Sequence, residues 1–252
     1  MPDPVNIVCM KWGVRYPVEY VNILFASVTR HLQRPFRFLC LTDDTTGLAP
    51  GIDTRGFPPN PGITQARWPN VFMKLVITAD GFADLTGPTL FLDLDLVVLD
   101  DIDCFFDYLP GKPCIIHNWV ERRKQILRPR PPIGNSSIFR FDAGRSGYIH
   151  DTFVREMRDA NDRTKFCTEQ AFLTHAMKEP NWWPEEWVRS FKFNCRPIFP
   201  LNLFLAPRQP KGAKFLVFHG KPDPHEAVHG TRGKRIHHRV LPVPWVAGHW
   251  RV

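Results

Sequence analysis

The chain lacks several features that define common classes of protein. No apolar run approaches the roughly 18 residues that a membrane-spanning helix needs. The first residues, Met1-Pro2-Asp3-Pro4, have neither the basic region nor the apolar core of a signal peptide. No internal repeat and no low-complexity linker interrupts the sequence. We therefore expect a cytoplasmic protein folded as one continuous domain.

Cysteine is sparse and follows no pattern of a disulfide framework or a zinc site. No Cys-x-x-Cys pair occurs among the six cysteines, which are Cys9, Cys40, Cys104, Cys114, Cys167 and Cys195. Three of them stand inside apolar runs, where a free thiol behaves as a small hydrophobic side chain. We expect reduced cysteines that serve as packing residues.

Charge is divided unevenly along the chain, whose formal net charge is +8. Residues 1–110 carry 8 Lys and Arg against 13 Asp and Glu, a net charge of −5, and residues 111–252 carry 25 against 12, a net charge of +13. No acidic residue follows Glu226. The acidic half is suited to a cation and the basic half to an anion, such as a nucleotide diphosphate or a phospholipid surface. No nucleic-acid-binding motif accompanies the charge, so no nucleic-acid partner is expected.

Strand-like and helix-like segments alternate along the first hundred residues. Short apolar runs predict strands at residues 5–10, 36–41 and 89–99, and helical spacing predicts helices at 20–32 and 72–79. This alternation is typical of an α/β domain with a mainly parallel sheet. Ligands bind beyond the carboxyl ends of such strands, so the break at residues 11–16 is expected at the ligand edge. Later strands are expected at 114–117, 137–141 and 215–218, and later helices at 147–161 and 168–177.

Two carboxylates stand in the most apolar of these strands. Asp93 and Asp95 lie within Phe91–Val98, and residues two apart on a continuous strand face the same side. Two unpaired carboxylates among Leu and Val are costly to bury, and a hard divalent cation such as Mn²⁺ or Mg²⁺ removes that cost. The pattern predicts a metal site. A strand end at which both carboxylates reach solvent or a lysine is the alternative.

Two classes of enzyme carry such a pair. The pattern hhhDxDx(T/V) of haloacid-dehalogenase-type phosphatases is satisfied by Asp93–Val97, with Asp93 as the nucleophile. Here, however, the segment follows two strand–helix units instead of ending the first strand, and no later acidic pair completes that metal site. The phosphatase is therefore the less favoured class.

The other class is the nucleotide-sugar glycosyltransferases. Residues 90–103, LFLDLDLVVLDDID, resemble the YLDaDtlVl.DId.lf segment of GT-A fold glycosyltransferases, especially those of the family 8 type. The resemblance spans roughly residues 5–222. It implies that Asp93, Leu94 and Asp95 contact a nucleotide-sugar donor, with Asp93 and Asp95 on a metal ion.

Further segments resemble that family in the same order. Tyr16, after the first strand, is similar to the tyrosine that contacts the nucleotide base, although the family's TDxxY is here Lys11–Tyr16, which weakens the assignment of uridine. Lys74 lies near the position of a basic residue that contacts the donor. The segment 135–141 is similar to one that lines the sugar pocket, which implies that Asn135 and Ser136 orient the sugar. A turn before a strand would favour the same two residue types.

The resemblance also assigns residues close to the reacting carbon. Glu169-Gln170 is similar to the family's DQ pair, which implies that Gln170 supports the oxocarbenium-like sugar while Glu169 binds its hydroxyls. An exposed helix start explains this pair nearly as well. In Phe218–Pro224 the histidine directly precedes the glycine, unlike the family's His-x-x-Gly-x-x-Lys-Pro-Trp, and we expect His219 as the third metal ligand. Lys221 is expected near the diphosphate. A histidine that only ends a strand and a solvated surface lysine are the alternatives.

Together these features predict a single-domain, GT-A-like (Rossmann-like) α/β protein with a mainly parallel sheet flanked by helices. We expect a nucleotide- and metal-binding half at residues 1–110, a sugar- and acceptor-binding half at 111–225 and a basic tail at 226–252. The resemblance implies a glycosyltransferase that depends on Mn²⁺ or Mg²⁺ and moves a sugar, with retention, from a UDP-sugar to a saccharide or lipid-linked acceptor.

Two other functions remain open at this point. One is the phosphatase, and the other is a non-catalytic protein that binds nucleotide sugars or polyanions. For any of them, the basic tail predicts peripheral contact with the inner face of an anionic membrane.

Overall fold

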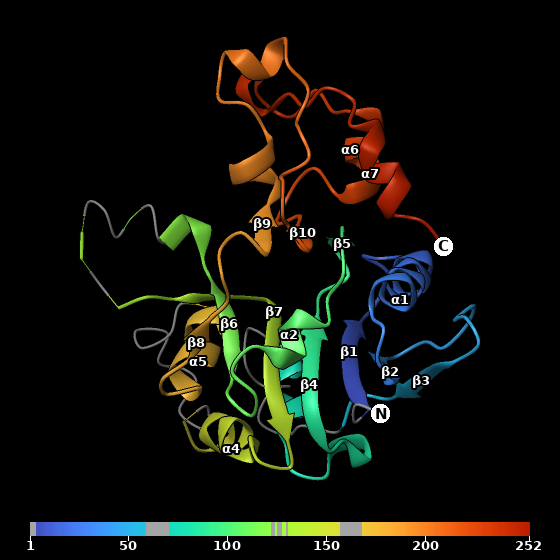
Figure 1. The fold of residues 1–252 in the computed structure, drawn as a ribbon, viewed down its shortest axis with the longest axis vertical. Coiled ribbons are helices and arrows are strands. Elements are labelled where there is room, and N and C mark those ends of the chain that lie inside the picture. Colours follow the sequence, from blue (N-terminus) through green and yellow to red (C-terminus); the bar gives the residue numbers. More distant parts are fainter. Residues whose placement is uncertain (1–3, 59–70, 122–123, 125–127, 130, 157–167) are drawn as a thin grey trace.

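The computed structural model describes residues 4–58, 71–121, 124, 128–129, 131–156 and 168–252. Its centre is a seven-stranded sheet in the order β3-β2-β1-β4-β7-β6-β8 (Figure 1). The strands are β1 (Val5–Lys11), β2 (Phe36–Thr42), β3 (Ile52–Arg55), β4 (Gly87–Leu92), β6 (Cys114–His117), β7 (Gly134–Ala143) and β8 (Asn181–Trp182).

The sheet is mixed, with parallel pairs in the majority. β1 pairs in parallel with β2 and β4, β2 with β3, and β6 with β8. Only β7 runs against its neighbours, β4 and β6. The mainly parallel α/β sheet expected from the sequence is confirmed. Its parallel strands β1 and β4 therefore end at a common edge, as ligand-binding α/β sheets require.

A second sheet has three strands in the order β5-β10-β9. They are β5 (Leu96–Val98), β9 (Val188–Ser190) and β10 (Phe215–Val217). β10 runs antiparallel to β5 and parallel to β9. This sheet brings the late apolar strand expected from the sequence against the segment that follows Asp95.

The strand predicted at residues 89–99 is two strands, and this corrects the sequence interpretation. β4 ends at Leu92 in the large sheet and β5 begins at Leu96 in the small one. The backbone N–H of Asp93 still donates to Ser137 O in β7 (2.9 Å), whereas the carbonyl of Asp95 already accepts from Phe218 N beyond β10 (3.0 Å). Asp93 and Asp95 therefore occupy a bend between two sheets, and the alternation of a continuous strand does not apply to them.

Helices cover both faces of the large sheet, as the alternation of side chains along β1 requires. Ile7 and Cys9 pack in one apolar cluster with α1 (Glu19–His31) and α2 (Cys104–Asp107). Val8 points into the opposite cluster, which contains side chains of η1 (Val71–Thr78), α4 (Gly147–Glu156) and α5 (Glu169–Ala176). A further short 3₁₀ turn is η2 (Phe82–Asp84). The helix expected at 72–79 is present but has 3₁₀ geometry, and residues 157–161 of the expected helix 147–161 lie outside the described part of the chain.

The C-terminal region packs around the small sheet through a third apolar cluster. Its helical segments are η4 (Phe191–Cys195, a π-helical turn), η5 (Leu201–Leu203), α6 (Pro224–His229), η6 (Ile236–His238) and α7 (Pro244–His249). The chain end is fastened to α1, where Arg30 donates to the carbonyls of His249 (3.2 Å) and Arg251 (2.8 Å). The basic tail is therefore folded onto the domain.

The structure bears on the cysteines and on membrane-spanning segments. Cys9, Cys40, Cys104, Cys114 and Cys195 are free thiols, and Cys167 lies outside the described residues. Within the described chain, no helix is long and apolar enough to cross a membrane.

Candidate active site

A cleft of about 590 Å³ opens at the carboxyl ends of β1 and β4. Its walls come from three segments: the loop after β1, the helical turn η1 and the bend between β4 and β5. The lining residues are Met10, Trp12, Gly13, Val14, Arg15, Tyr16, Lys74, Asp93, Leu94 and Asp95. Five of the predicted site residues are thus brought together in one cavity: Tyr16, Lys74, Asp93, Leu94 and Asp95.

The loop after β1 is fixed to the neighbouring strand. The backbone N–H of Gly13 donates to the Asp43 carboxylate just after β2 (3.0 Å), and Gly13 adopts φ +58°, a conformation that glycine reaches without strain. The loop places Tyr16 over the cleft, where its hydroxyl donates to Asp95 Oδ2 (3.2 Å). Burial first, and then the charge of Asp95, raise the pKa of Tyr16, so the phenol remains protonated and able to donate.

Asp95 is the carboxylate most strongly affected by its surroundings. Burial, and after it the neighbouring charge of Asp93, raise the pKa of Asp95 to about 7. The hydrogen bond from Tyr16 and the charge of Lys74 oppose this shift without cancelling it. Two half-buried carboxylates in one bend are therefore electrostatically frustrated, and a bound cation would relieve the frustration.

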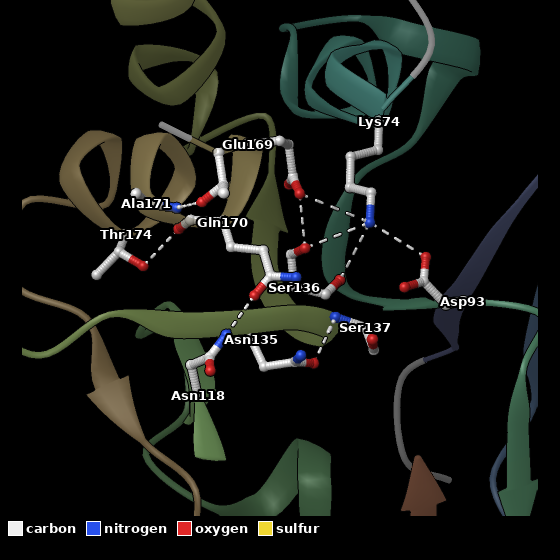
Figure 2. Close-up of polar contacts among 11 residues, drawn as sticks. Lys74, Asp93, Asn118, Asn135, Ser136, Ser137, Glu169, Gln170, Ala171 and Thr174 are labelled. Carbon is white, nitrogen blue, oxygen red and sulfur yellow. Dashed lines mark hydrogen bonds and ion pairs between the residues drawn. The ribbon is translucent and has the colours of Figure 1, made fainter. Parts of the chain in front are cut away.

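Lys74 is the centre of a buried polar network (Figure 2). Its ammonium donates to Asp93 Oδ1 (3.1 Å) and to Ser136 Oγ (3.4 Å), and lies 3.9 Å from Glu169 Oε2. Burial alone would lower the pKa of Lys74, but the charges of Asp93 and Glu169 outweigh it and the pKa is raised. Lys74 is thus a permanent buried cation that holds Asp93 at the wall of the cleft, and it is not a solvated surface lysine.

Glu169 and Ser136 complete this network from α5 and β7. Ser136 donates to Glu169 Oε2 (2.7 Å), and Glu169 is 4% exposed, so the exposed helix start considered for this residue is wrong. Burial raises the pKa of Glu169 against the opposing effects of Lys74 and Ser136. Its second oxygen, Oε1, is buried and has no hydrogen-bond partner among the residues that the structure describes. An acceptor of this kind is costly unless a donor group arrives with a ligand.

Asn135 and Gln170 lie beside the network on the same two elements. Asn135 is buried inside β7, not in a turn before it, and its Oδ1 accepts from Ser137 N (3.1 Å). Gln170 Oε1 accepts a hydrogen bond from Asn118 Nδ2 (2.6 Å), which fixes the direction of the amide (Figure 2). Sequence reasoning missed Asn118. It directly follows β6, and a polar residue after a strand was the signal that could have found it.

His219 does not join the carboxylates as the sequence predicted. No three His, Cys, Asp or Glu side chains are grouped to hold a metal within the described residues. The ring of His219 instead forms a hydrogen bond with Ser190 Oγ (2.7 Å) and stacks on Trp119, with ring centroids 5.5 Å apart. Burial and the nearby Lys192 lower its pKa to about 4, so it is neutral at pH 7. The backbone N–H of the preceding residue, Phe218, nevertheless donates to the Asp95 carbonyl (3.0 Å), so the backbone next to His219 lies at the bend while its ring contacts Ser190 and Trp119.

The site therefore fits a divalent cation in part. Asp93 and Asp95 supply hard oxygen ligands, and burial together with the charge of Asp93 raises the pKa of Asp95, as expected for a site that binds positive charge. Any further ligands would have to come from the substrate, from water or from a rotated His219.

Lys221 lies outside the residues that line the cleft. Its ammonium pairs with Asp223 (2.7 Å) and Glu226 (2.8 Å) at the start of α6, and its side chain is 69% exposed. This is the geometry of a surface ion pair. Its contact with a diphosphate stays a prediction.

Comparison with known proteins shows what this arrangement resembles. No protein-family model and no curated protein sequence matches the chain. One matching solved structure is the galactosyltransferase LgtC with donor and acceptor sugar analogues, which aligns with a TM-score of 0.58 at 16% identity over 87% of this chain and 88% of its own. Another is an LgtC active-site mutant in which glutamate replaces glutamine, with a TM-score of 0.59 at 14% identity over 87% of this chain and 89% of its own. A third, the bifunctional glycosyltransferase WbbM, aligns with a TM-score of 0.60 at 14% identity over 89% of this chain and 47% of its own.

The chain has the GT-A glycosyltransferase fold. This confirms the fold expected from the resemblance of residues 90–103, and the alignment extends over nearly the whole chain. At such low identity the likeness carries the architecture, while the chemistry must be argued from the cleft.

Proposed function

We propose that the chain is a glycosyltransferase that transfers a sugar from a nucleotide-diphosphate donor, with UDP as the nucleotide, to a saccharide or lipid-linked acceptor. One observation carries the proposal: in a GT-A fold, the carboxyl-end cleft holds two crowded carboxylates beside a buried lysine network. The solved neighbours are glycosyltransferases, and one of them, LgtC, holds donor and acceptor sugar analogues.

The donor is oriented by groups already held in place. Tyr16 and its loop, on residues 1–110, would contact the base. Leu94, which lines the cleft, would contact the donor, and the exposed Lys221 would contribute positive charge toward the diphosphate. Asn135 and Ser136 would hold the sugar in the second half of the chain, where the unpartnered Oε1 of Glu169 is available to a sugar hydroxyl.

Charge at the reacting carbon is handled by Gln170 and its neighbours. The Asn118 amide donates to Gln170 Oε1, so this oxygen is held in one direction and can stabilise a positively charged anomeric carbon. We propose transfer with retention, which the resemblance of residues 90–103 to family 8 glycosyltransferases implies. Asp93 and Asp95 would hold Mn²⁺ or Mg²⁺, which when bound neutralises charge on the departing diphosphate.

Calorimetric titration tests the donor site directly. UDP, GDP, CDP and ADP are titrated with and without Mn²⁺ into wild type, Asp95→Ala and Asp53→Ala. Asp53 is the matched control because it forms an exposed ion pair with Arg37 (2.7 Å) on the far strands β2 and β3. We expect UDP to bind with Mn²⁺, to lose about 100-fold or more in affinity in Asp95→Ala, and to be unaffected in Asp53→Ala. Binding of no nucleotide under any condition would contradict the proposal.

The two remaining functions give different results with the same protein. A phosphatase would release phosphate from p-nitrophenyl phosphate and would lose this activity in Asp93→Asn. A binding protein would retain UDP but would not turn over any UDP-sugar when the donor panel is followed by NMR. The same spectra report whether the anomeric configuration of a transferred sugar is retained.

A further inference from the structure

A cluster of large apolar side chains is exposed on two segments of the C-terminal region. Five of them follow one another closely in residues 198–205, and the sixth is on η6. The exposed fractions are 76% for Ile198, 53% for Phe199, 50% for Leu201, 76% for Phe204, 45% for Leu205 and 64% for Ile236. Single exposed apolar residues are common, but a group of six marks an interaction surface. We call this group the apolar patch.

The two segments are held together by a buried side chain. Asn202, 1% exposed within η5, donates through Nδ2 to the carbonyls of His237 (3.2 Å) and Arg239 (2.9 Å). The ring centroids of Phe199 and His237 lie 6.5 Å apart across the same junction. The apolar patch is therefore one built surface and not two unrelated loops. Figure 1 shows these segments, in orange and red, at the end of the molecule opposite α4.

Basic residues adjoin the apolar patch on both of its segments. The pKa of His238 is lowered by desolvation, by the neighbouring His237 and by the positive charges of Arg196, Arg235 and Lys192, so these three cations lie within electrostatic reach of η6. More basic side chains are exposed nearby in the sequence, namely Arg208, Arg232, Lys234 and Arg239. Residues 188–252 contain only two acidic residues, Asp223 and Glu226, and both are bound to Lys221.

We propose that the apolar patch docks on the surface of an anionic lipid bilayer, with Ile198, Phe199, Phe204 and Ile236 entering the headgroup and acyl boundary. Apolar side chains within a basic rim match such a membrane in both chemistry and charge. Lys and Arg can keep their charges at the phosphate level while their stems follow the apolar surface. Docking of this kind requires the apolar residues of 198–205, whereas attachment by the basic tail alone would not.

Other occupants fit the surface less well. A second copy of the chain, docked through the same patch, would bring two basic rims together and meet charge repulsion. A nucleic acid would satisfy the charges but would leave the aliphatic side chains Ile198, Leu201 and Ile236 without a partner, since only aromatic faces stack on bases.

Flotation with lipid vesicles tests the proposal. The full-length protein is mixed with vesicles of phosphatidylcholine alone or with 30 mol% phosphatidylglycerol, at 50 and 150 mM NaCl. We expect the wild type to float with the anionic vesicles at both salt concentrations and poorly with phosphatidylcholine. The partition coefficient should fall about tenfold or more in Phe204→Glu and in Ile236→Glu, which lie on different segments, and severalfold in Arg235→Glu.

Matched controls separate the patch from general effects of charge. Val252→Glu places the same new charge on a residue that is equally exposed, 76%, at the chain end beside α1. Arg145→Glu reverses a basic side chain that is 83% exposed near α4. Both variants should float like the wild type. Circular dichroism and UDP titration of each variant check folding, and the membrane proposal does not depend on the outcome for UDP.

Several results would overturn the proposal. They are absence of wild-type flotation, equal flotation with uncharged vesicles, or Phe204→Glu and Ile236→Glu binding like the wild type while Arg235→Glu alone weakens. Light scattering that shows a dimer abolished by Phe204→Glu, without lipid binding, would assign the surface to a second copy of the chain instead.

Discussion

The cleft and the C-terminal region use charge in opposite ways. In the cleft, Lys74 is buried against Asp93 and Glu169, and these three charged groups are fixed partners of one another. In residues 188–252, twelve basic residues face two acidic ones, and many of the basic side chains are exposed. Both regions belong to one fold and share an apolar cluster that joins β1 and β4 to β5 and β10.

Buried and exposed charges have different effects on a protein. A buried charge with fixed partners is screened little by salt and defines geometry to fractions of an ångström, which a reacting site requires. Exposed charges of one sign contribute little to folding, but they act over about a Debye length and attract an opposite surface. Substitutions in the cleft should therefore change stability and chemistry, and those at the C-terminal surface should change association.

The sharpest test of this contrast replaces one lysine in each setting. Lys74→Met leaves Asp93 and the buried Glu169 without a countercharge, and we expect it to lower the free energy of unfolding by about 3–5 kcal/mol. Lys214→Met breaks the exposed pair with Asp100 (2.7 Å) and should cost about 1 kcal/mol or less. Urea denaturation measures both values. Adding Glu169→Gln to Lys74→Met should recover part of the loss. Equal losses in the two single variants would show that burial does not distinguish the two lysines.

The pH dependence of stability tests the crowded carboxylates. The pKa of Asp95 is about 7 in the folded protein and about 4 when unfolded, so between these values the folded state binds more protons. Its contribution to stability is complete below pH 4 and is lost as the pH rises through 7. Without metal, the free energy of unfolding of the wild type should therefore fall by roughly 2 kcal/mol more between pH 4 and pH 7 than that of Asp95→Asn.

His219 acts with the opposite sign in the same window and must be separated from Asp95. Its pKa is lowered to about 4, so its contribution to stability is lost as the pH falls from 6.5 to 4. Comparison of wild type with Asp95→Asn cancels this effect, because both proteins keep His219. An identical pH profile for the two proteins would show that Asp95 is not perturbed.

Asn202 is a buried polar residue in the otherwise exposed C-terminal surface. It is buried, but it anchors an exposed surface, so Asn202→Ala should remove about 1–2 kcal/mol of stability by leaving the carbonyls of His237 and Arg239 unpaired. Hydrogen exchange should increase in residues 198–205 and 236–239, while the amides of β1 and β4 remain protected. Faster exchange throughout the large sheet would mean that the C-terminal region is not an independent unit of stability.

The smallest effect on folding is expected at the exposed basic rim. Arg235→Glu should change the free energy of unfolding by less than about 0.5 kcal/mol, even though we expect it to weaken vesicle binding. A thermal melt in 50 and 500 mM NaCl measures the change. A large loss of stability would place Arg235 among the residues that hold the fold.

The sequence predicted the order of strands and helices well because apolar periodicity is local. The runs at β1, β2 and β10 and the helical spacing of α1 need no tertiary information. The bend at Asp93–Asp95 could not be predicted in this way. Apolar residues on both sides of it imitate one strand, and it contains neither glycine nor proline.

The candidate site was predictable in its residue types but not in its connections. Lys74 and Asp93 were both expected at the site, yet their hydrogen bond and the burial of Glu169 depend on how η1, β4 and α5 pack. The orientation of His219 depends on Ser190 and Trp119, which are distant in the sequence. Such contacts are properties of the folded chain alone.

The bend between β4 and β5 also has a mechanical consequence. Asp93 is tied by its backbone to the large sheet and Asp95 to the small one, with a single residue, Leu94, between them. A small rotation of one sheet against the other is therefore converted directly into a change in the spacing of the two carboxylates. The distance between the two carboxylates is therefore determined by how β7 packs on one side of the bend and how β10 packs on the other.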